Sequence, residues 1–106
     1  MQTLVVYDIP SDKIRNRVAE ACKDYGLDRI QWSAFLGELT HNRRGELALR
    51  LRRTLGREDG SIHIYPICDK DFGLRTEIGT LDPSRLARKG EGEGDTGEDP
   101  AAAGRA

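Results

Sequence analysis

The chain has 106 residues, which suits one domain, and its formal net charge of -1 excludes a uniformly basic protein. It has no apolar run long enough to span a membrane and no signal peptide at its N-terminus, so we expect a cytoplasmic protein. The charge is uneven, because residues 90–106 carry five acids and one arginine, whereas residues 1–89 carry 16 Lys or Arg and 13 Asp or Glu. The first 89 residues are therefore mildly basic and rich in arginine, a side chain suited to phosphate.

The sequence lacks several well-known chemical motifs. There is no glycine-rich phosphate loop, no HExxH motif and no cysteine–histidine cluster. The two cysteines, Cys22 and Cys68, do not form a CxxC pair and are too few for a zinc site, so we expect both to be reduced and mostly buried.

The N-terminal third predicts a strand followed by a helix. Residues 3–7 are β-branched and apolar, which indicates a strand that ends on the carboxylate of Asp8. After Pro10, Ser11 or Asp12 is a suitable helix N-cap, and Gly26 is a suitable residue just beyond the helix end. The residues at helical spacing on one face are apolar: Ile14, Val18, Ala21, Cys22 and Tyr25.

The middle of the chain predicts strand structure and a second helix. Residues 29–36 alternate in polarity, which indicates either one long kinked strand or two short strands, with Ser33 and Phe35 on the same side and Trp32 in the core. Thr40 can cap a helix over 41–55 that ends at Gly56. Its apolar stripe is Leu47, Ala48, Leu51 and Leu55.

The last third predicts a strand and a C-terminal extension. Residues 58–60 form a turn, residues 61–67 a strand and residues 72–79 a short final strand. We expect residues 1–80 to form the folded domain and residues 81–106 an extension, whose acidic, glycine-rich part, 90–106, is a flexible tail.

This order predicts an α+β fold: a ferredoxin-like split βαβ, in which two helices cover one face of an antiparallel sheet. Such a sheet should be polar on its bare face, yet the first and last main strands are apolar on both faces. Leu4 and Val5 are neighbours on one strand, so they point to opposite faces of the sheet, and both are apolar. The same holds for Ile64 and Tyr65 on the last main strand. We therefore expect a second copy to cover the bare face and form a two-fold homodimer.

Asp8 is the main candidate for chemistry. At a strand end it is either a cap for the following helix or a metal ligand. A two-fold axis near this end would bring two Asp8 carboxylates together, and they repel one another unless one is protonated or a cation lies between them. Magnesium is often held by one or two carboxylates and water, so the dimer predicts a site for Mg2+ or another divalent cation.

Arginines are the candidates for nucleic-acid binding. Arg15 and Arg17 on the exposed part of the first helix and Arg29 on the second strand either pair with local acids or bind phosphate. Glu46 is the only acid in residues 41–53, so the second helix is a candidate phosphate-facing surface. Its arginines are Arg43, Arg44, Arg50, Arg52 and Arg53. Ser33 is either a hydrogen-bond partner near the metal or an ordinary strand hydroxyl. Phe35 either packs in the core or the dimer interface, which the sequence favours, or is a platform for base stacking.

Taken together, these residues resemble the CRISPR-associated protein 2 family, the small subunit of the spacer-acquisition machinery. The resemblance covers roughly residues 1–80. It rests on Val5-Val6-Tyr7-Asp8-Ile9 with Arg15 and Arg17, on Tyr25-Gly26-Leu27 with Arg29, on Gln31-Trp32-Ser33-Ala34-Phe35-Leu36-Gly37-Glu38-Leu39, and on Gly60-Ser61-Ile62-His63-Ile64-Tyr65-Pro66-Ile67-Cys68.

The resemblance implies a ferredoxin-like homodimer that acts as a metal-dependent endonuclease on single-stranded RNA or double-stranded DNA during spacer acquisition. It implies that Asp8 is the catalytic, metal-binding residue, with a supporting set of Tyr7, Arg15, Arg17, Arg29, Phe35 and Ser33. The alternative is a non-catalytic DNA-binding scaffold, a dimer that bridges the integrase subunits of the CRISPR-associated protein 1 family. The sequence leaves open which nucleic acid is the substrate and which group is the general base.

Overall fold

The computed structural model describes residues 1–79, which form four strands and three helices. In chain order these are β1 (Gln2–Asp8), α1 (Asp12–Asp24), β2 (Asp28–Gln31), β3 (Ala34–Glu38), α2 (His41–Leu55), β4 (Ser61–Ile67) and α3 (Asp69–Gly73). Residues 29–36 are thus two strands rather than one kinked strand. The predicted extension over residues 81–106 lies outside the described residues.

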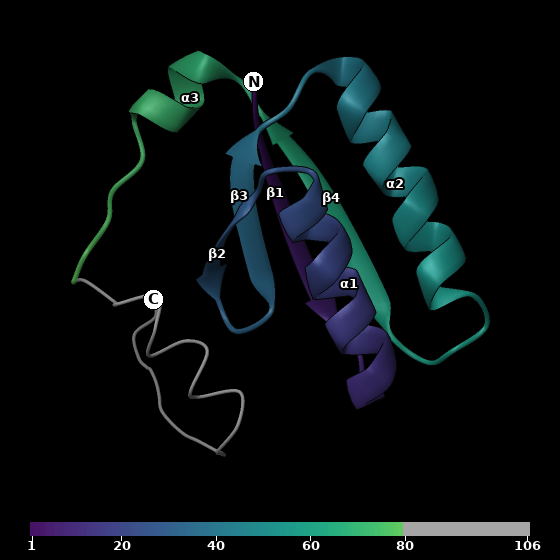
Figure 1. Ribbon diagram of the computed structural model, residues 1–106. Coiled ribbons are helices and arrows are strands. Elements are labelled where there is room, and N and C mark those ends of the chain that lie inside the picture. The colour runs from purple at the N-terminus through teal and green to yellow at the C-terminus, as the bar shows by residue number, and fades with distance from the viewer. Residues whose placement is uncertain (80–106) are drawn as a thin grey trace.

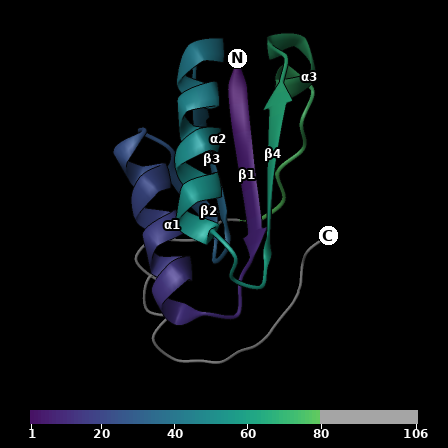
Figure 2. The same ribbon diagram turned by 90° about the vertical axis from the view of Figure 1, so that its right-hand side faces the viewer.

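The four strands form one antiparallel sheet in the order β2-β3-β1-β4, with β1 between β3 and β4. Helices α1 and α2 lie side by side on one face of this sheet, as the two views in Figures 1 and 2 show. The predicted split βαβ arrangement with both helices on one face is confirmed.

The core lies between the sheet and the two helices. On β1 the inward residues Thr3, Val5 and Tyr7 are buried, and Phe35 of β3 lies opposite Val5. The helices contribute the apolar stripes that their sequences predict, with buried Ile14, Val18, Ala19, Ala21, Cys22, Leu47 and Leu51.

The other face of the sheet is partly apolar and has no cover within residues 1–79. Leu4 and Val6 of β1 point to this face, because side chains alternate along a strand. Leu36 and Tyr65 lie directly beside Leu4 on the neighbouring strands, and Tyr65 is 49% exposed. The prediction that both faces carry apolar side chains is confirmed, and the dimer stays a prediction.

The helix ends follow the capping residues in the sequence. The Ser11 side chain accepts a hydrogen bond from the Ile14 amide at 3.2 Å, and Thr40 accepts one from the Arg43 amide at 3.1 Å. Gly26, with φ of +83°, follows α1 in a left-handed conformation. Asp8 therefore does not cap α1.

The prediction of a short strand over residues 72–79 is wrong. Asp69–Gly73 is the short helix α3, and residues 74–79 contain no strand. The helix begins there because Cys68 accepts a hydrogen bond from the Asp71 amide at 3.4 Å, and because acids in the first turn favour a helix N-terminus. Cys68 is consequently exposed, contrary to expectation, whereas Cys22 is buried as expected.

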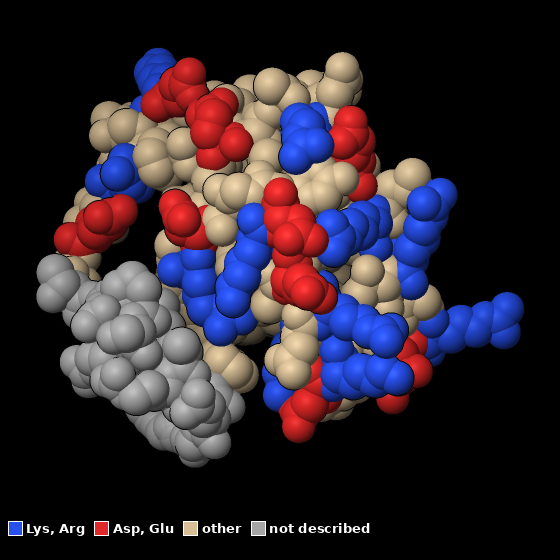
Figure 3. Space-filling view, in the orientation of Figure 1, with Lys and Arg blue, Asp and Glu red and all other residues tan. Residues whose placement is uncertain are grey.

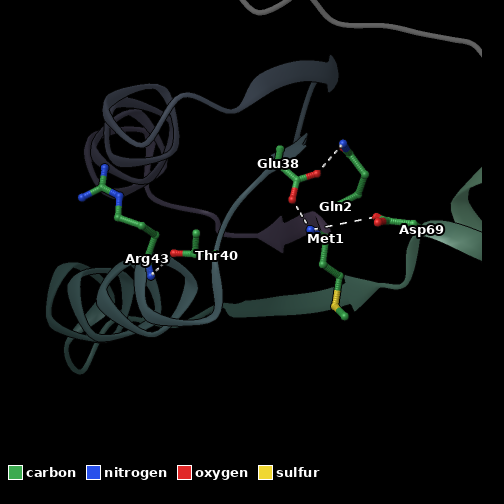
Figure 4. A network of polar contacts seen from close by, with 6 residues as sticks. All are labelled: Met1, Gln2, Glu38, Thr40, Arg43 and Asp69. Carbon is green, nitrogen blue, oxygen red and sulfur yellow. Dashed lines mark hydrogen bonds and ion pairs between the residues drawn. The ribbon is translucent and has the colours of Figure 1, made fainter.

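Polar contacts join the start of β1 to its neighbours (Figure 4). The Met1 amino group pairs with Glu38 at the end of β3 and lies 4.0 Å from Asp69 of α3, and the Gln2 amide donates to Glu38 at 3.3 Å. These contacts mark the end of the sheet opposite Asp8. No helix within residues 1–79 has both the length and the apolar composition needed to cross a membrane.

Candidate functional site at the Asp8 end of the sheet

Asp8 is the last residue of the central strand β1. Its alternation places it on the face of the sheet away from the helices, opposite Ser61 of β4. The carboxylate is exposed and makes no hydrogen bond or ion pair with another residue in the range 1–79. Because it has no partner there, this carboxylate is available to a cation from solution.

Gly60 fixes the backbone beside Asp8. It precedes β4 with φ of +139°, a conformation that L side chains rarely adopt. A Cβ built on Gly60 would lie 2.9 Å from the Asp8 carbonyl oxygen and 3.0 Å from the Ile9 side chain. The sequence pattern predicts only a turn at Gly60, although the position of this glycine immediately before a strand is a signal for such a close approach.

The turn between β2 and β3 forms another side of the site. Trp32 and Ser33 are the two turn residues, and the Ser33 carbonyl accepts a hydrogen bond from the Tyr7 amide at 3.0 Å. The prediction that Ser33 and Phe35 lie on the same side of one strand is wrong, because Ser33 belongs to the turn. The hydrogen bond nevertheless places Ser33 next to the end of β1.

Arg15 lies across the loop between β1 and α1. Its guanidinium donates to the Ile9 carbonyl at 3.0 Å and to the Pro10 carbonyl at 3.3 Å, and it pairs with Asp12. The Arg15 side chain is only 23% exposed, so it is half-buried instead of lying on the exposed part of α1 as expected. The expected pairing with Asp12 is confirmed, and the contacts place a positive charge close to the Asp8 end.

Arg29 is held between two aromatic rings. Its guanidinium carbon lies 5.0 Å from the ring centre of Trp32 and 5.0 Å from that of Phe35, within the range of cation–π attraction. Trp32 also lies 5.8 Å from the Arg15 guanidinium, so one half-buried ring contacts both arginines. The prediction that Trp32 belongs to the core is wrong, because the turn places its ring between the two arginines, and no local pattern signals this contact.

Tyr7 and Phe35 support the site from within the core. Both are buried, and their rings stack at 6.4 Å. Burial raises the pKa of the Tyr7 hydroxyl, and the nearby positive charge of Arg29 partly opposes that rise. The Tyr7 hydroxyl is buried and has no hydrogen-bond partner among residues 1–79. Neither ring is placed to touch a ligand on the surface.

The remaining candidate arginines are not part of this cluster. Arg17 is exposed on α1, and no acid lies within 4.0 Å of it among residues 1–79. Arg50 pairs at 2.9 Å with Asp24, and Arg43 lies 4.3 Å from the Tyr25 ring. Asp24 and Tyr25 are at the C-terminal end of α1, whereas α1 begins beside Asp8, so about 20 Å of helix separates the two regions.

Lys and Arg side chains spread across the face formed by α1 and α2 (Figure 3). These two helices contain nine Lys or Arg and four Asp or Glu, whereas the rest of residues 1–79 contains four Lys or Arg and eight Asp or Glu. Helices α1 and α2 therefore form a basic helix layer, distinct from the unpaired Asp8 carboxylate at the end of the sheet. This layer is a second candidate surface for nucleic acid.

Asp8 offers a minimal set of metal donors. Within residues 1–79, no three His, Cys, Asp or Glu side chains come together in one chain. A magnesium ion that keeps several waters needs only one or two carboxylates, so the exposed Asp8 with the Ser61 position beside it fits such an ion.

Comparison with known proteins identifies the family. Residues 1–74 match the family described as CRISPR associated protein Cas2. A relative from Desulforudis audaxviator, named CRISPR-associated endoribonuclease Cas2, is 58% identical over 78 residues, which cover 74% of each chain. A relative from Thermoproteus tenax, named a fusion of CRISPR-associated endonuclease Cas1 and endonuclease Cas2, is 40% identical over 84 residues, 79% of this chain and 32% of the fusion.

Solved structures agree with this result. The crystal structure of Cas2 from Streptococcus pyogenes has a TM-score of 0.63 at 27% identity and covers 74% of this chain and all of its own. A hypothetical protein from Thermus thermophilus also has a TM-score of 0.63, at 31% identity, over 76% of this chain and 90% of that one. On the strength of the match over residues 1–74 and of these relatives, the chain belongs to the CRISPR associated protein Cas2 family.

Proposed function

We propose that this protein is a CRISPR-associated endonuclease that hydrolyses phosphodiester bonds at the Asp8 end of its sheet. The observation that carries the proposal is the exposed, unpaired Asp8 carboxylate at the end of β1, next to the loop whose Ile9 and Pro10 carbonyls bind the half-buried Arg15 guanidinium. Trp32, in the turn beside the end of β1, contacts both Arg15 and Arg29. The name endoribonuclease borne by the Desulforudis audaxviator relative supports the reaction type.

Each residue has a distinct task in this proposal. Asp8 holds a divalent cation, which would supply Lewis acidity and lower the pKa of a bound water. Arg15 and Arg29 bind the oxygens of the scissile phosphate and stabilise the charge that develops on them. Tyr7, Phe35 and Trp32 keep Arg29 in position, so that it does not have to be ordered when the substrate binds.

We further propose that the working unit is a homodimer joined through the bare face of the sheet. Leu4, Val6, Leu36 and Tyr65 provide apolar surface there, and Asp8 lies at the end of the same face. A two-fold dimer on this face would place two Asp8 residues on one side of the assembly, and two carboxylates with water form a better magnesium site than one.

A second candidate function is that of a DNA-binding scaffold, and the basic helix layer favours it. Arg43, Arg44 and Arg50 are remote from Asp8, so they can hold nucleic acid without taking part in hydrolysis. The fusion of Cas1 and Cas2 in Thermoproteus tenax supports a partner of the CRISPR-associated protein 1 family for this role.

An Asp8→Asn substitution tests the nuclease. We expect the magnesium-dependent cleavage rate of a labelled single-stranded RNA or duplex DNA to fall by about 10²-fold or more, the scale of loss when a group that activates the attacking water is removed. Binding of the same oligonucleotide, measured by fluorescence anisotropy, should persist because the arginines remain. Asp28→Asn is the matched control, since Asp28 is an exposed aspartate at the start of β2. Cleavage at the wild-type rate by the Asp8→Asn protein would exclude Asp8 as the catalytic residue.

Charge reversal on α2 tests the scaffold. We expect Arg43→Glu with Arg44→Glu to weaken duplex binding and to lower the slope of log K against log salt by about 0.9 for each phosphate that the protein no longer neutralises. Arg75→Glu is the control, because Arg75 pairs with Glu77 after α3. An unchanged slope would exclude the α2 arginines as phosphate-binding residues.

A further inference from the structure

We propose that the acidic C-terminal segment, residues 90–106, docks on the helix layer of its own chain and competes there with nucleic acid. The docking surface is the helix groove, a shallow depression of about 480 Å³ lined by Tyr25, Glu46, Leu49, Arg50, Arg53 and Thr54. The family match covers residues 1–74 and so does not reach this segment.

The helix groove carries positive charge that the described residues do not fully balance. Arg53 has no acid within 4.0 Å among residues 1–79, and neither does its neighbour Arg52. Arg50 in the groove pairs with the exposed Asp24, and Arg43, which contacts the lining residue Tyr25, pairs with the exposed Glu46. Such exposed pairs are weak enough to exchange for another carboxylate.

The groove also has an apolar floor. Leu49 is 48% exposed on α2, and the Tyr25 ring has the Arg43 guanidinium against it at 4.3 Å. A basic rim around a small apolar patch suits an acidic segment with small side chains, which can approach closely without filling a deep pocket.

Residues 90–106 have that chemistry. Their five acids, Glu91, Glu93, Asp95, Glu98 and Asp99, are interspersed with glycine, threonine and proline, and Ala101 to Ala103 follow. The segment has a net charge of -4, against nine Lys or Arg and four Asp or Glu in α1 and α2. Charge complementarity therefore favours the helix layer over the rest of residues 1–79, where acids outnumber bases.

The chain is long enough for this contact. Eleven residues lead from Gly79 to Gly90, and an extended chain spans about 3.3–3.6 Å per residue, or about 40 Å in all. The largest extent of the molecule is 36 Å, so the acids can reach α2. Because the segment is tethered, its local concentration is in the millimolar range, and several weak ion pairs suffice for occupancy.

The docking does not depend on the proposed function, but its effect on nucleic acid does. A strand of nucleic acid that approaches the helix layer would have to displace the segment, as one polyanion displaces another. The segment would therefore weaken non-specific binding most at low salt, where both competitors bind best.

The first experiment measures docking without any nucleic acid. The full chain is compared with a full-length variant in which Glu91, Glu93 and Glu98 become Gln and Asp95 and Asp99 become Asn. We expect the amide resonances of Leu49, Arg50 and Arg53 to differ between the two proteins at about 50 mM salt, to converge at high salt where ion pairs are screened, and to be independent of protein concentration. Amides of α3 should not change.

Identical α2 resonances in the two proteins would overturn the proposal. Differences located on the bare face of the sheet, or differences that grow with protein concentration, would mean that the segment binds elsewhere or on another copy, and would overturn it as well. A synthetic peptide of residues 90–106, added to the neutralised variant, should restore the wild-type resonances.

The second experiment measures competition with an oligonucleotide. We expect the neutralised variant to bind a duplex about tenfold more tightly than the wild type at about 50 mM salt and with a steeper salt slope. The control neutralises five acids outside the helix layer, Asp28, Glu58, Asp69, Asp71 and Glu77, and so makes the same change in net charge. An equal gain in the control would show that net charge alone is responsible and would overturn the competition. Absence of oligonucleotide binding in every variant would overturn the proposed function, while the resonances would still decide the docking.

Discussion

Gly60 meets the end of β1 so closely that no other residue fits without movement of the backbone. Its Cβ would meet the Asp8 carbonyl at 2.9 Å, and its φ of +139° disfavours any side chain. The position of the Asp8 carboxylate thus depends on a residue with no side chain. Gly45, in the middle of α2, has nothing within 4 Å of a Cβ and an ordinary helical conformation.

The two glycines provide a matched test. We expect Gly60→Ala to lower the free energy of unfolding by about 1–3 kcal/mol, because an alanine at this φ is strained and its Cβ would displace the end of β1. Gly45→Ala should raise it by up to about 1 kcal/mol, since alanine favours a helix. Urea unfolding measures both, and a Gly60→Ala protein as stable as the wild type would contradict the close approach.

Cys22 and Tyr7 predict a loss of stability at alkaline pH. Burial raises the pKa of the Cys22 thiol from 9.0 to about 12, and burial also raises the pKa of the Tyr7 hydroxyl. In the unfolded chain these groups ionise near their ordinary pKa values, while in the folded protein they stay neutral. The unfolded chain therefore releases protons first, and stability falls as the pH rises from about 9 toward about 12.

Urea unfolding at about pH 8, 9 and 10.5 checks this prediction, because these values span the ordinary pKa of a thiol. The free energy of unfolding should fall across the series, and it should fall less steeply in Cys22→Ala, although that variant is less stable throughout because it leaves a cavity. Equal slopes in the two proteins would show that Cys22 does not ionise differently on folding.

At the scale of elements, the directions of the helices decide which arginines are near Asp8. Helix α1 starts beside Asp8 and runs away from it, so Arg15 in its first turns joins the site. Helix α2 starts at the opposite end of the sheet, after β3, so Arg43 and Arg44 in its first turns lie far from Asp8. The two groups of arginines therefore serve different surfaces.

The Thr40 cap fixes where α2 begins. Its side chain accepts from the Arg43 amide, so Thr40→Ala should cost about 1 kcal/mol of stability, as loss of an N-cap typically does. The control is Thr54→Ala within the same helix, whose hydroxyl donates to the Arg50 carbonyl and which should change stability by less. Thermal unfolding monitored by circular dichroism compares them, and equal losses would argue against the cap.

At the scale of the whole molecule, residues 1–79 cover one apolar face of the sheet and leave the other bare. Leu4, Val6 and Leu36 on the bare face are half-buried by their neighbours in the sheet and still present apolar surface. A single chain of this size buries limited apolar area, so a partner on this face would add to its stability.

The dimer prediction has a direct measurement. Sedimentation velocity should give twice the 11.8 kDa mass of one chain for the wild type. Leu36→Glu should weaken association at least about tenfold, because it buries a charge in the proposed interface. Leu49→Glu on α2 should leave the mass unchanged. A monomeric wild-type protein would contradict the dimer and, with it, the pairing of two Asp8 residues.

Local patterns in the sequence determined β1, α1, α2 and β4 and where they end. The alternation in β1, the capping residues Ser11 and Thr40, and the glycines after α1 and α2 act within a few residues of themselves, so they could be interpreted without a structure. The exposed carboxylate at the end of β1 was predicted in the same way.

Only the tertiary structure decided which side chains meet. Trp32 contacts Arg15 and Arg29 because a two-residue turn brings β2 beside the start of α1, and Gly60 contacts Asp8 across a strand pair. Residues 72–79 were predicted as a strand, yet the Cys68 cap and the acids after it begin a helix. Contacts between residues far apart in the chain depend on strand order and turn geometry, which no local pattern of residues encodes.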